Sequence, residues 1–190
     1  MLALGVGPRV PGWVRCPVCG GQLRGFWAGY ERTVRLAGGR GLVRLRIGRT
    51  RCVGRCRRTH ALVPSLVVPR RLDAASVIGA AFGLAAGGLG HRQVAARLVV
   101  PVTTVRGWLR RAQARAGLVS SRLWRFAMEL GGVAPRPPPG ERPLAAVLRA
   151  AGSARAVAVS RFGEAGLPDC FGLCVCLLGD GLLGAHTDSP

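Results

Sequence analysis

Apolar and polar residues alternate with a period of two in the first third of the chain. Val43, Leu45 and Ile47 are separated by single arginines, a spacing that is typical of a half-buried strand. Val34 and Leu36 repeat this spacing on the other side of a glycine-rich turn. We therefore predict an antiparallel hairpin here.

From Asp73 onwards the period changes to that of a helix. Asp73 is placed to cap a helix that runs from Ala74 to about Ala86. Its apolar positions recur every three or four residues, as expected for a helix that faces a core. They are Val77, Ile78, Ala81, Phe82 and Ala85.

Residues 91–116 predict two further helices joined by a tight corner. Pro101 ends the first helix because it donates no amide hydrogen, and Thr103 or Thr104 can cap the second. Val99 stands where such corners usually have glycine. The core-facing positions of the two helices are Val94, Ala95 and Leu98, then Val105, Trp108, Leu109 and Ala112.

This layout is typical of a helix-turn-helix, whose second helix, here Thr103 to about Ala116, enters the DNA major groove. Arginines on such a helix bind guanine or phosphate. The alternative is a helical hairpin that packs internally or against a protein, with solvated arginines. The residues expected to contact DNA are Arg92, Thr103, Thr104, Arg106, Gly107, Arg110 and Arg111.

The tail is predicted to be mostly helical. An amphipathic helix runs over 119–130, a proline-rich linker over 134–143, and two short helices over 144–151 and 154–162. The last apolar stretch, 171–178, fits a strand or a helix equally well.

Four cysteines near the hairpin have the spacing of metal ligands. Cys16 and Cys19 form one pair and Cys52 and Cys56 the other, and such pairs in a reducing compartment favour zinc over a disulfide. Four thiolates leave no open position for catalysis, so we expect a structural Zn²⁺. A redox dithiol and unrelated buried cysteines are the alternatives.

The second pair has three intervening residues instead of two, so His60 is a candidate substitute ligand. A packing or phosphate-contacting role is the favoured interpretation of His60. Cys170, Cys174 and Cys176 lie far away, with His186 as the one further ligand nearby. Buried free thiols are favoured there over a second metal site.

The predicted fold class is α+β, mainly α, in three parts. Residues 1–72 form a small zinc ribbon, a β-hairpin with two cysteine knuckles; residues 73–117 form a three-helix, helix-turn-helix domain; residues 118–190 form a helical C-terminal region with its linker at 134–143.

Charge separates the first two parts from the third. The formal net charge is +20, and all 28 basic residues are arginine. Residues 1–117 hold 21 arginines and two acids (net +19), and residues 118–190 hold seven arginines and six acids (net +1). A codon bias would act along the whole chain, so the confined charge indicates a polyanionic partner for the first part.

The start of the chain does not resemble a signal peptide, and the longest uncharged run, 74–90, includes Gly87, Gly88 and Gly90 and is shorter than a membrane span. We therefore expect a cytoplasmic, nucleoid-associated protein without a membrane partner. A homodimer is compatible with the helix-turn-helix, although no heptad repeat supports it.

The motifs CPVCGG, RCVGRCRRTHALVP and HRQVAARL, followed by PVTTVRGWLRR, resemble a bacterial domain of unknown function found in GC-rich genomes. The resemblance covers residues 13–117. It implies a transposase-like zinc ribbon joined to a helix-turn-helix, and hence DNA binding without an established activity.

The leading hypothesis is a zinc-dependent, sequence-preferring binder of double-stranded DNA, either a transcriptional regulator or a transposase-derived recognition module. A nuclease is not expected, because the six tail acids lie in a short region interrupted by the linker. The alternatives are an arginine-rich zinc-ribbon protein that binds RNA and a non-catalytic remnant or adaptor of a transposase.

Overall fold

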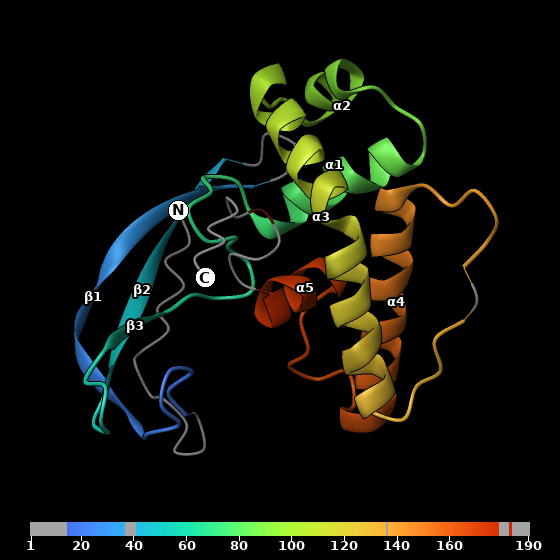
Figure 1. Cartoon of the computed structure of the whole chain (residues 1–190). Coiled ribbons are helices and arrows are strands. Elements are labelled where there is room, and N and C mark those ends of the chain that lie inside the picture. Colours follow the sequence, from blue (N-terminus) through green and yellow to red (C-terminus); the bar gives the residue numbers. More distant parts are fainter. Residues whose placement is uncertain (1–14, 37–40, 136, 179–182, 184–190) are drawn as a thin grey trace. The chain divides into compact units, whose positions relative to one another are not determined.

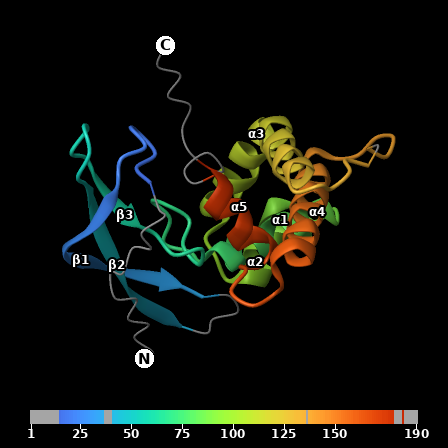
Figure 2. The same cartoon turned by 90° about the horizontal axis from the view of Figure 1, so that it is seen from below.

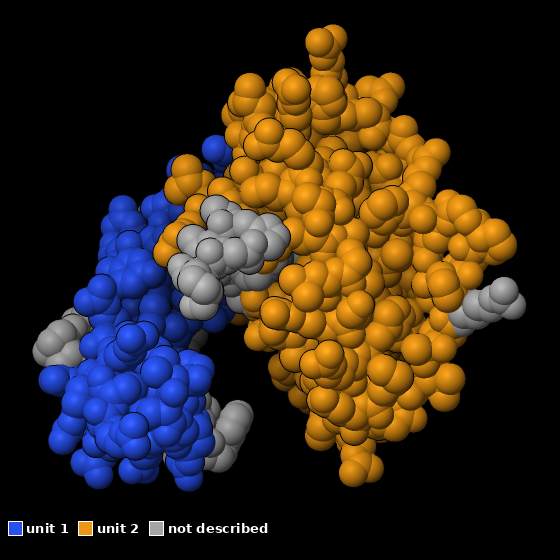
Figure 3. All heavy atoms as spheres, in the orientation of Figure 1, with its two compact units in different colours: residues 1–36, 40–64 blue, residues 37–39, 65–190 orange. Residues whose placement is uncertain are grey.

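The computed structural model describes residues 15–36, 41–135, 137–178 and 183. The chain forms two compact units, coloured separately in Figure 3: residues 1–36 with 40–64, and residues 37–39 with 65–190. The described strands belong to the first unit and the described helices to the second.

The first unit contains a three-stranded antiparallel sheet in the order β1-β2-β3. Its strands are β1 (Leu23–Arg35), β2 (Leu42–Cys52) and β3 (Thr59–Leu62). Val34 pairs directly with Val43, as the predicted hairpin requires, and β1 and β2 form a long curved ribbon (Figure 1). The third strand was not predicted.

Alternation along β2 changes phase part of the way along the strand. Leu45 and Ile47 are buried, whereas further on the buried positions are Thr50 and Cys52. The change coincides with an irregularity in the pairing of β1, between Phe26 and Tyr30. A local irregularity of this kind redirects the side chains that follow it. The change of phase places the side chain of Cys52 on the buried face of β2.

The second unit contains α1 (Ala75–Ala86), α2 (His91–Leu98), α3 (Val102–Glu129), α4 (Pro143–Phe162) and α5 (Cys170–Leu178). Helices α3 and α4 lie side by side, and α1 contacts all four other helices (Figures 1 and 2). Phe82 on α1 meets Phe171 on α5 edge to face, with ring centroids 5.2 Å apart. This core explains the apolar stripe predicted for α1.

Helix α3 is longer than predicted. The sequence was divided near Ala116 into two helices, but a single helix of 28 residues runs through this point. Gly117 costs a helix only about 1 kcal/mol, and Ala116, Val119 and Leu123 continue the buried stripe. For the same reason α4 is one helix where two were predicted.

The predicted caps were also wrong. Helix α1 begins after Ala74, and no side-chain cap is formed there; Asp73 is instead buried. Helix α3 begins after Pro101, whose carbonyl accepts hydrogen bonds from the N–H groups of Thr104 and Val105. Proline fits this position because its fixed φ matches the chain entering a helix.

The undecided segment near the end of the chain is the helix α5. Within the described part of the chain, no helix combines the length and the apolar character that crossing a membrane requires.

Candidate metal centre and nucleic-acid interface

Cys16, Cys19, Cys52 and Cys56 converge in the first unit, as their spacing predicted. Their sulfur atoms all lie within 4.8 Å of one another. The Sγ atoms of Cys16 and Cys56 are 3.5 Å apart, and so are those of Cys19 and Cys52. Sulfurs bound tetrahedrally to one ion at ~2.3 Å would be separated by about 3.8 Å. The four cysteines can therefore hold one metal ion.

The first pair lies in a tight turn closed by the backbone. The N–H of Cys16 donates to the carbonyl of Gly21 at 2.8 Å, and the N–H of Gly20 donates to the carbonyl of Cys16 at 2.8 Å. Gly20 has a φ of 69°, in the left-handed region that favours glycine. These bonds direct both sulfurs of the turn to the same side.

The second turn closes in the same way in spite of its extra residue. The N–H of Cys52 donates to the carbonyl of Arg58 at 2.9 Å. In both turns the bond joins the first cysteine to the residue two positions after the second cysteine. Arg57, which follows Cys56, has a φ of 53° and corresponds to Gly20. The extra residue is therefore accommodated between Cys52 and Cys56, and the metal-binding geometry of the turn is kept.

Two glycines allow the turns to approach each other. A Cβ atom on Gly21 would lie 3.0 Å from the Cα of Gly54 and 3.1 Å from the Sγ of Cys52. The N–H of Val53 also donates to the carbonyl of Gln22 at 3.0 Å, which joins the turns directly. The role of Gly54 was not predicted from the sequence. A glycine between two paired cysteines was the available signal.

Backbone amides favour the thiolate form of Cys19. Interactions with the backbone of Cys56 and then of Gly21 lower the pKa of Cys19 to about 6. Cys56 shows the opposite effect: the backbone of Arg58 favours its thiolate, but burial and the neighbouring cysteines outweigh it and raise its pKa to about 12. Negative charges gathered this closely oppose further ionisation unless a cation is bound among them.

His60 lies against the cysteine cluster. Its Nε2 atom is 3.3 Å from the Sγ of Cys16, and the residue is half-buried at the end of the sheet. This position allows Nε2 to form a hydrogen bond with a metal-bound thiolate. The imidazole is also close enough to the cluster to serve as a further metal ligand. The favoured interpretation of His60 as a packing or phosphate-contacting residue missed this contact.

The cysteines of the tail are not gathered in this way. Cys174 is buried, and burial raises its pKa to about 12. Cys170 and Cys176 are exposed, so the interpretation as buried thiols was correct for Cys174 only. His186 lies outside the described residues.

Exposed arginines follow β2 and the second cysteine turn. Arg44 forms an ion pair with Glu31 at 3.4 Å, and the guanidinium of Arg49 lies 5.7 Å from the centre of the Tyr30 ring. Both contacts are at the surface and contribute little stability. The exposed arginines here are Arg44, Arg46, Arg49, Arg51, Arg55, Arg57 and Arg58.

The beginning of α3 presents three of the predicted DNA contacts on one face. Thr103, Arg106 and Arg110 are exposed and follow one another at intervals of three and four residues, which places them on the same side of a helix. The opposite side is buried through Trp108 and Leu109. The chain from Ala74 to Met128 contains no acidic residue. The helices α1 and α2, and α3 as far as Met128, thus contribute no carboxylate to this surface, and the one acid of α3, Glu129, lies at the far end of the helix.

The other predicted contacts differ in accessibility. Arg92 is exposed on α2, whereas Thr104, Gly107 and Arg111 are half-buried. A Cβ atom on Gly107 would lie 3.0 Å from Nη2 of Arg111, so this guanidinium lies back along the helix. Burial, together with the charges of Arg71 and Arg110, lowers the pKa of Arg111. Arg111 therefore reaches outward less than Arg106 and Arg110.

The corner between α2 and α3 is tight, as predicted. Val99 has φ 55° and ψ 47°, the left-handed conformation that was expected to call for glycine. The N–H of Val100 donates to the carbonyl of Ala95 at 3.1 Å, which closes the end of α2. A β-branched residue is strained in this conformation.

Part of the chain matches a known family. The family described as "Domain of unknown function (DUF6431)" matches residues 16–95. This range contains the four cysteines, the sheet and α1, and it ends within α2, so it is narrower than the resemblance expected from the sequence. Comparisons with curated proteins and with solved structures give no match.

Proposed function

We propose that the protein is a zinc-dependent, sequence-preferring binder of double-stranded DNA, acting as a transcriptional regulator or as a transposase-derived recognition module. In this proposal α2 and α3 form a helix-turn-helix, and the beginning of α3 enters the major groove. The observation that carries the proposal is the exposed face of Thr103, Arg106 and Arg110 at the start of α3.

Electrostatics supports this assignment. A helix face with arginines and no carboxylate along 74–128 suits a phosphate-lined groove better than a neutral protein surface. The exposed arginines of β2 would add contacts with phosphates, which increase affinity without reading sequence.

Zinc is the proposed ion of the cysteine cluster. Four thiolates select soft or borderline ions, and a tetrahedral Zn²⁺ saturated by four sulfurs serves structure, not catalysis. Its role would be to stabilise the first unit, in which few of the described residues are buried.

A catalytic role is not proposed. Glu141 and Glu164 are paired with Arg149 and Arg155 at 2.7 Å and 2.9 Å, and an oxygen of Asp169 accepts the N–H of Gly172 at 2.6 Å. These contacts engage three of the six tail carboxylates that a two-metal nuclease would need. Asp180 and Asp188 lie outside the described residues.

Selection of bound sequences from random DNA duplexes tests the proposal, with zinc content measured on the same sample. We expect enrichment of a shared motif at one zinc per chain, and an affinity that falls with salt. Equal recovery of all sequences would contradict sequence preference.

An arginine-rich RNA-binding protein is the second candidate. The observation that favours it is Tyr30, 40% exposed and stacked with Arg49, because aromatic and arginine planes bind unpaired bases. Competition between a duplex and a structured RNA at equal salt separates the two functions. Weak binding to both, abolished by moderate salt, would indicate the third candidate, a non-catalytic remnant or adaptor.

A further inference from the structure

A cavity of about 740 Å³ lies in the second unit, between α3, α4 and the proline-rich segment that precedes α4. This volume is within the usual range for sites that bind small organic molecules. Its walls are largely apolar, with Trp124 and Met128 on α3, Ala146 on α4, and Pro135 and Pro137 in the segment.

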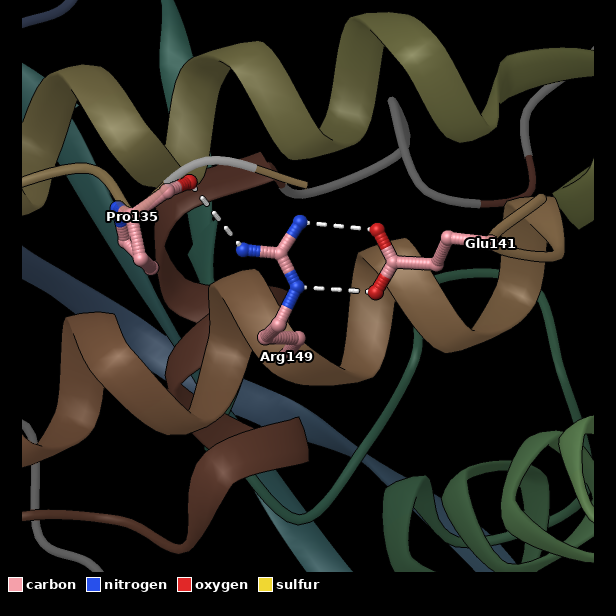
Figure 4. Close-up of polar contacts among 3 residues, drawn as sticks. All are labelled: Pro135, Glu141 and Arg149. Atoms are coloured by element: carbon pink, nitrogen blue, oxygen red, sulfur yellow. Dashed lines mark hydrogen bonds and ion pairs between the residues drawn. The ribbon is translucent and has the colours of Figure 1, made fainter. Parts of the chain in front are cut away.

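Two residues of the proline-rich segment, Pro135 and Glu141, are bound to α4 through one arginine. Arg149 on α4 donates two hydrogen bonds to the carboxylate of Glu141, at 2.8 Å and 2.7 Å, and a third to the carbonyl of Pro135 at 3.5 Å (Figure 4). Its guanidinium also lies 5.3 Å from the centre of the Trp124 ring. Bidentate pairs of this kind give geometric specificity, so the cavity is formed before any ligand binds.

The charge of the cavity restricts the ligand. Among the described residues that line it, Glu141 and Arg149 are the charged ones, and they neutralise each other. An ionic ligand would lose its hydration without gaining a free counter-charge. The cavity therefore favours an uncharged molecule.

Among the described residues that line the cavity, Ser120 carries a buried polar atom without a hydrogen-bond partner. The hydroxyl of Ser120 on α3 is buried, and no hydrogen bond is formed by its Oγ within the described structure. A buried hydroxyl without a partner is unfavourable, and a turn of the Ser120 side chain about χ1 would bring it to a hydroxyl or carbonyl group of a ligand in the cavity. The indole of Trp124 and the proline rings provide flat apolar surfaces for the rest of such a ligand.

We propose that the cavity between α3, α4 and the proline-rich segment is a binding site for a small, uncharged aromatic molecule that carries one hydroxyl or carbonyl group. Ser120 forms the hydrogen bond with this group, and Trp124 packs against the ring.

Equilibrium dialysis of the full-length protein with 1-naphthol and with naphthalene tests the site. We expect saturable binding of one 1-naphthol per chain. After correction for the different partitioning of the two probes into an apolar solvent, 1-naphthol should bind about threefold to tenfold more tightly than naphthalene, the effect of one hydrogen bond. The Ser120→Ala variant should bind both probes equally, whereas Ser160→Ala, at an exposed position on α4, should keep the preference.

A second variant blocks the cavity itself. Ala146→Phe should reduce the binding of both probes at least tenfold, and Ala156→Phe, exposed on the same helix, should leave it unchanged. Circular dichroism verifies that both variants are folded, and Ser120→Ala, which removes an unpartnered hydroxyl, should be as stable as the parent. The proposal is overturned if 1-naphthol does not bind saturably, if folded Ala146→Phe binds it normally, or if the preference survives Ser120→Ala.

Discussion

Gly21 and Gly54 face each other between the two cysteine turns, at a distance that leaves no room for a side chain. A Cβ atom on either residue would lie 3.0 Å from the Cα of the other and within 3.4 Å of the Sγ of Cys52. The atoms in the way are backbone and a candidate metal ligand, which cannot move aside without moving the cluster. The two glycines therefore allow the turns to come close enough for their four sulfurs to bind one ion.

Gly21→Ala should destabilise the first unit by about 1 to 3 kcal/mol, the usual cost of overpacking a rigid site. It should also weaken metal binding, because the added methyl displaces Cys52. Metal titration and urea unfolding of the variant measure both effects. Gly117→Ala, which adds its methyl in open space on α3, is the control and should be neutral or stabilising. Equal behaviour of the two variants would contradict the close-approach argument.

Removal of the metal should unfold the first unit selectively. Few of the described residues of this unit are buried, so the free energy of metal binding supplies much of its folding free energy. The helices belong to the other unit and contain none of the four cysteines. With a chelator present, the helical signal at 222 nm should persist while amide exchange in β1 and β2 becomes fast.

Replacing the cysteines provides the control for chelation. Cys52→Ser should reproduce the chelated state without any chelator, and added zinc should not restore it. Cys174→Ser, at a buried cysteine outside the cluster, should still respond to zinc. A loss of helical signal together with the sheet would show that the two units do not fold independently.

His60 is expected to support a metal ligand instead of being one. Its Nε2 atom lies 3.3 Å from the sulfur of Cys16, and four sulfurs already suffice for a tetrahedral ion. His60→Ala should weaken metal binding about 10- to 100-fold, the usual effect of losing an outer hydrogen bond to a ligand. The absorption spectrum of the Co²⁺-loaded variant should still indicate four thiolates. His91→Ala is the control and should bind the metal as the parent does. If the spectrum of the Co²⁺-loaded parent protein indicates one nitrogen ligand, His60 is itself a metal ligand.

The cysteine cluster was predictable because its signal is local. Each pair lies within a few residues, so each turn must present two thiols together, and the alternation around Leu45 predicts the strand that connects them. The position of His60 was less predictable, because it depends on the pairing of β3 with β2, opposite Thr50. A four-residue strand beside an arginine-rich turn carries little signal in a sequence.

The helix boundaries and the cavity could not be predicted from the sequence, for a different reason. Thr103 and Thr104 are good capping residues, yet Pro101 precedes the helix, because the corner at Val99 determines where the chain turns. The cavity depends on an ion pair between a linker residue and α4, Glu141 with Arg149. Such a contact between a linker and a helix does not leave a periodic pattern in the sequence.

Val99→Gly should stabilise the second unit. Val99 is left-handed and 72% exposed, so the substitution relieves strain and removes little packing. The strain amounts to about 1–2 kcal/mol, and the greater freedom of glycine in the unfolded chain offsets about 0.5–1 kcal/mol of it. A net gain of about 0.5–1 kcal/mol in the free energy of unfolding is expected from urea denaturation. Val133→Gly, at an exposed position without positive φ, should give no gain.

Arg106→Ala should separate sequence reading from general attraction to DNA. Arg106 is exposed in the second turn of α3, beside Thr103 and Arg110 on the proposed recognition face. If it binds a base, the variant should lose about 1–3 kcal/mol on the selected duplex and little on a random one. Arg125→Ala, exposed on the same helix more than four turns further on, is the matched control and should bind both duplexes normally. Equal loss on both duplexes would make Arg106 a phosphate contact, and no loss on either would remove this face of α3 from the DNA interface.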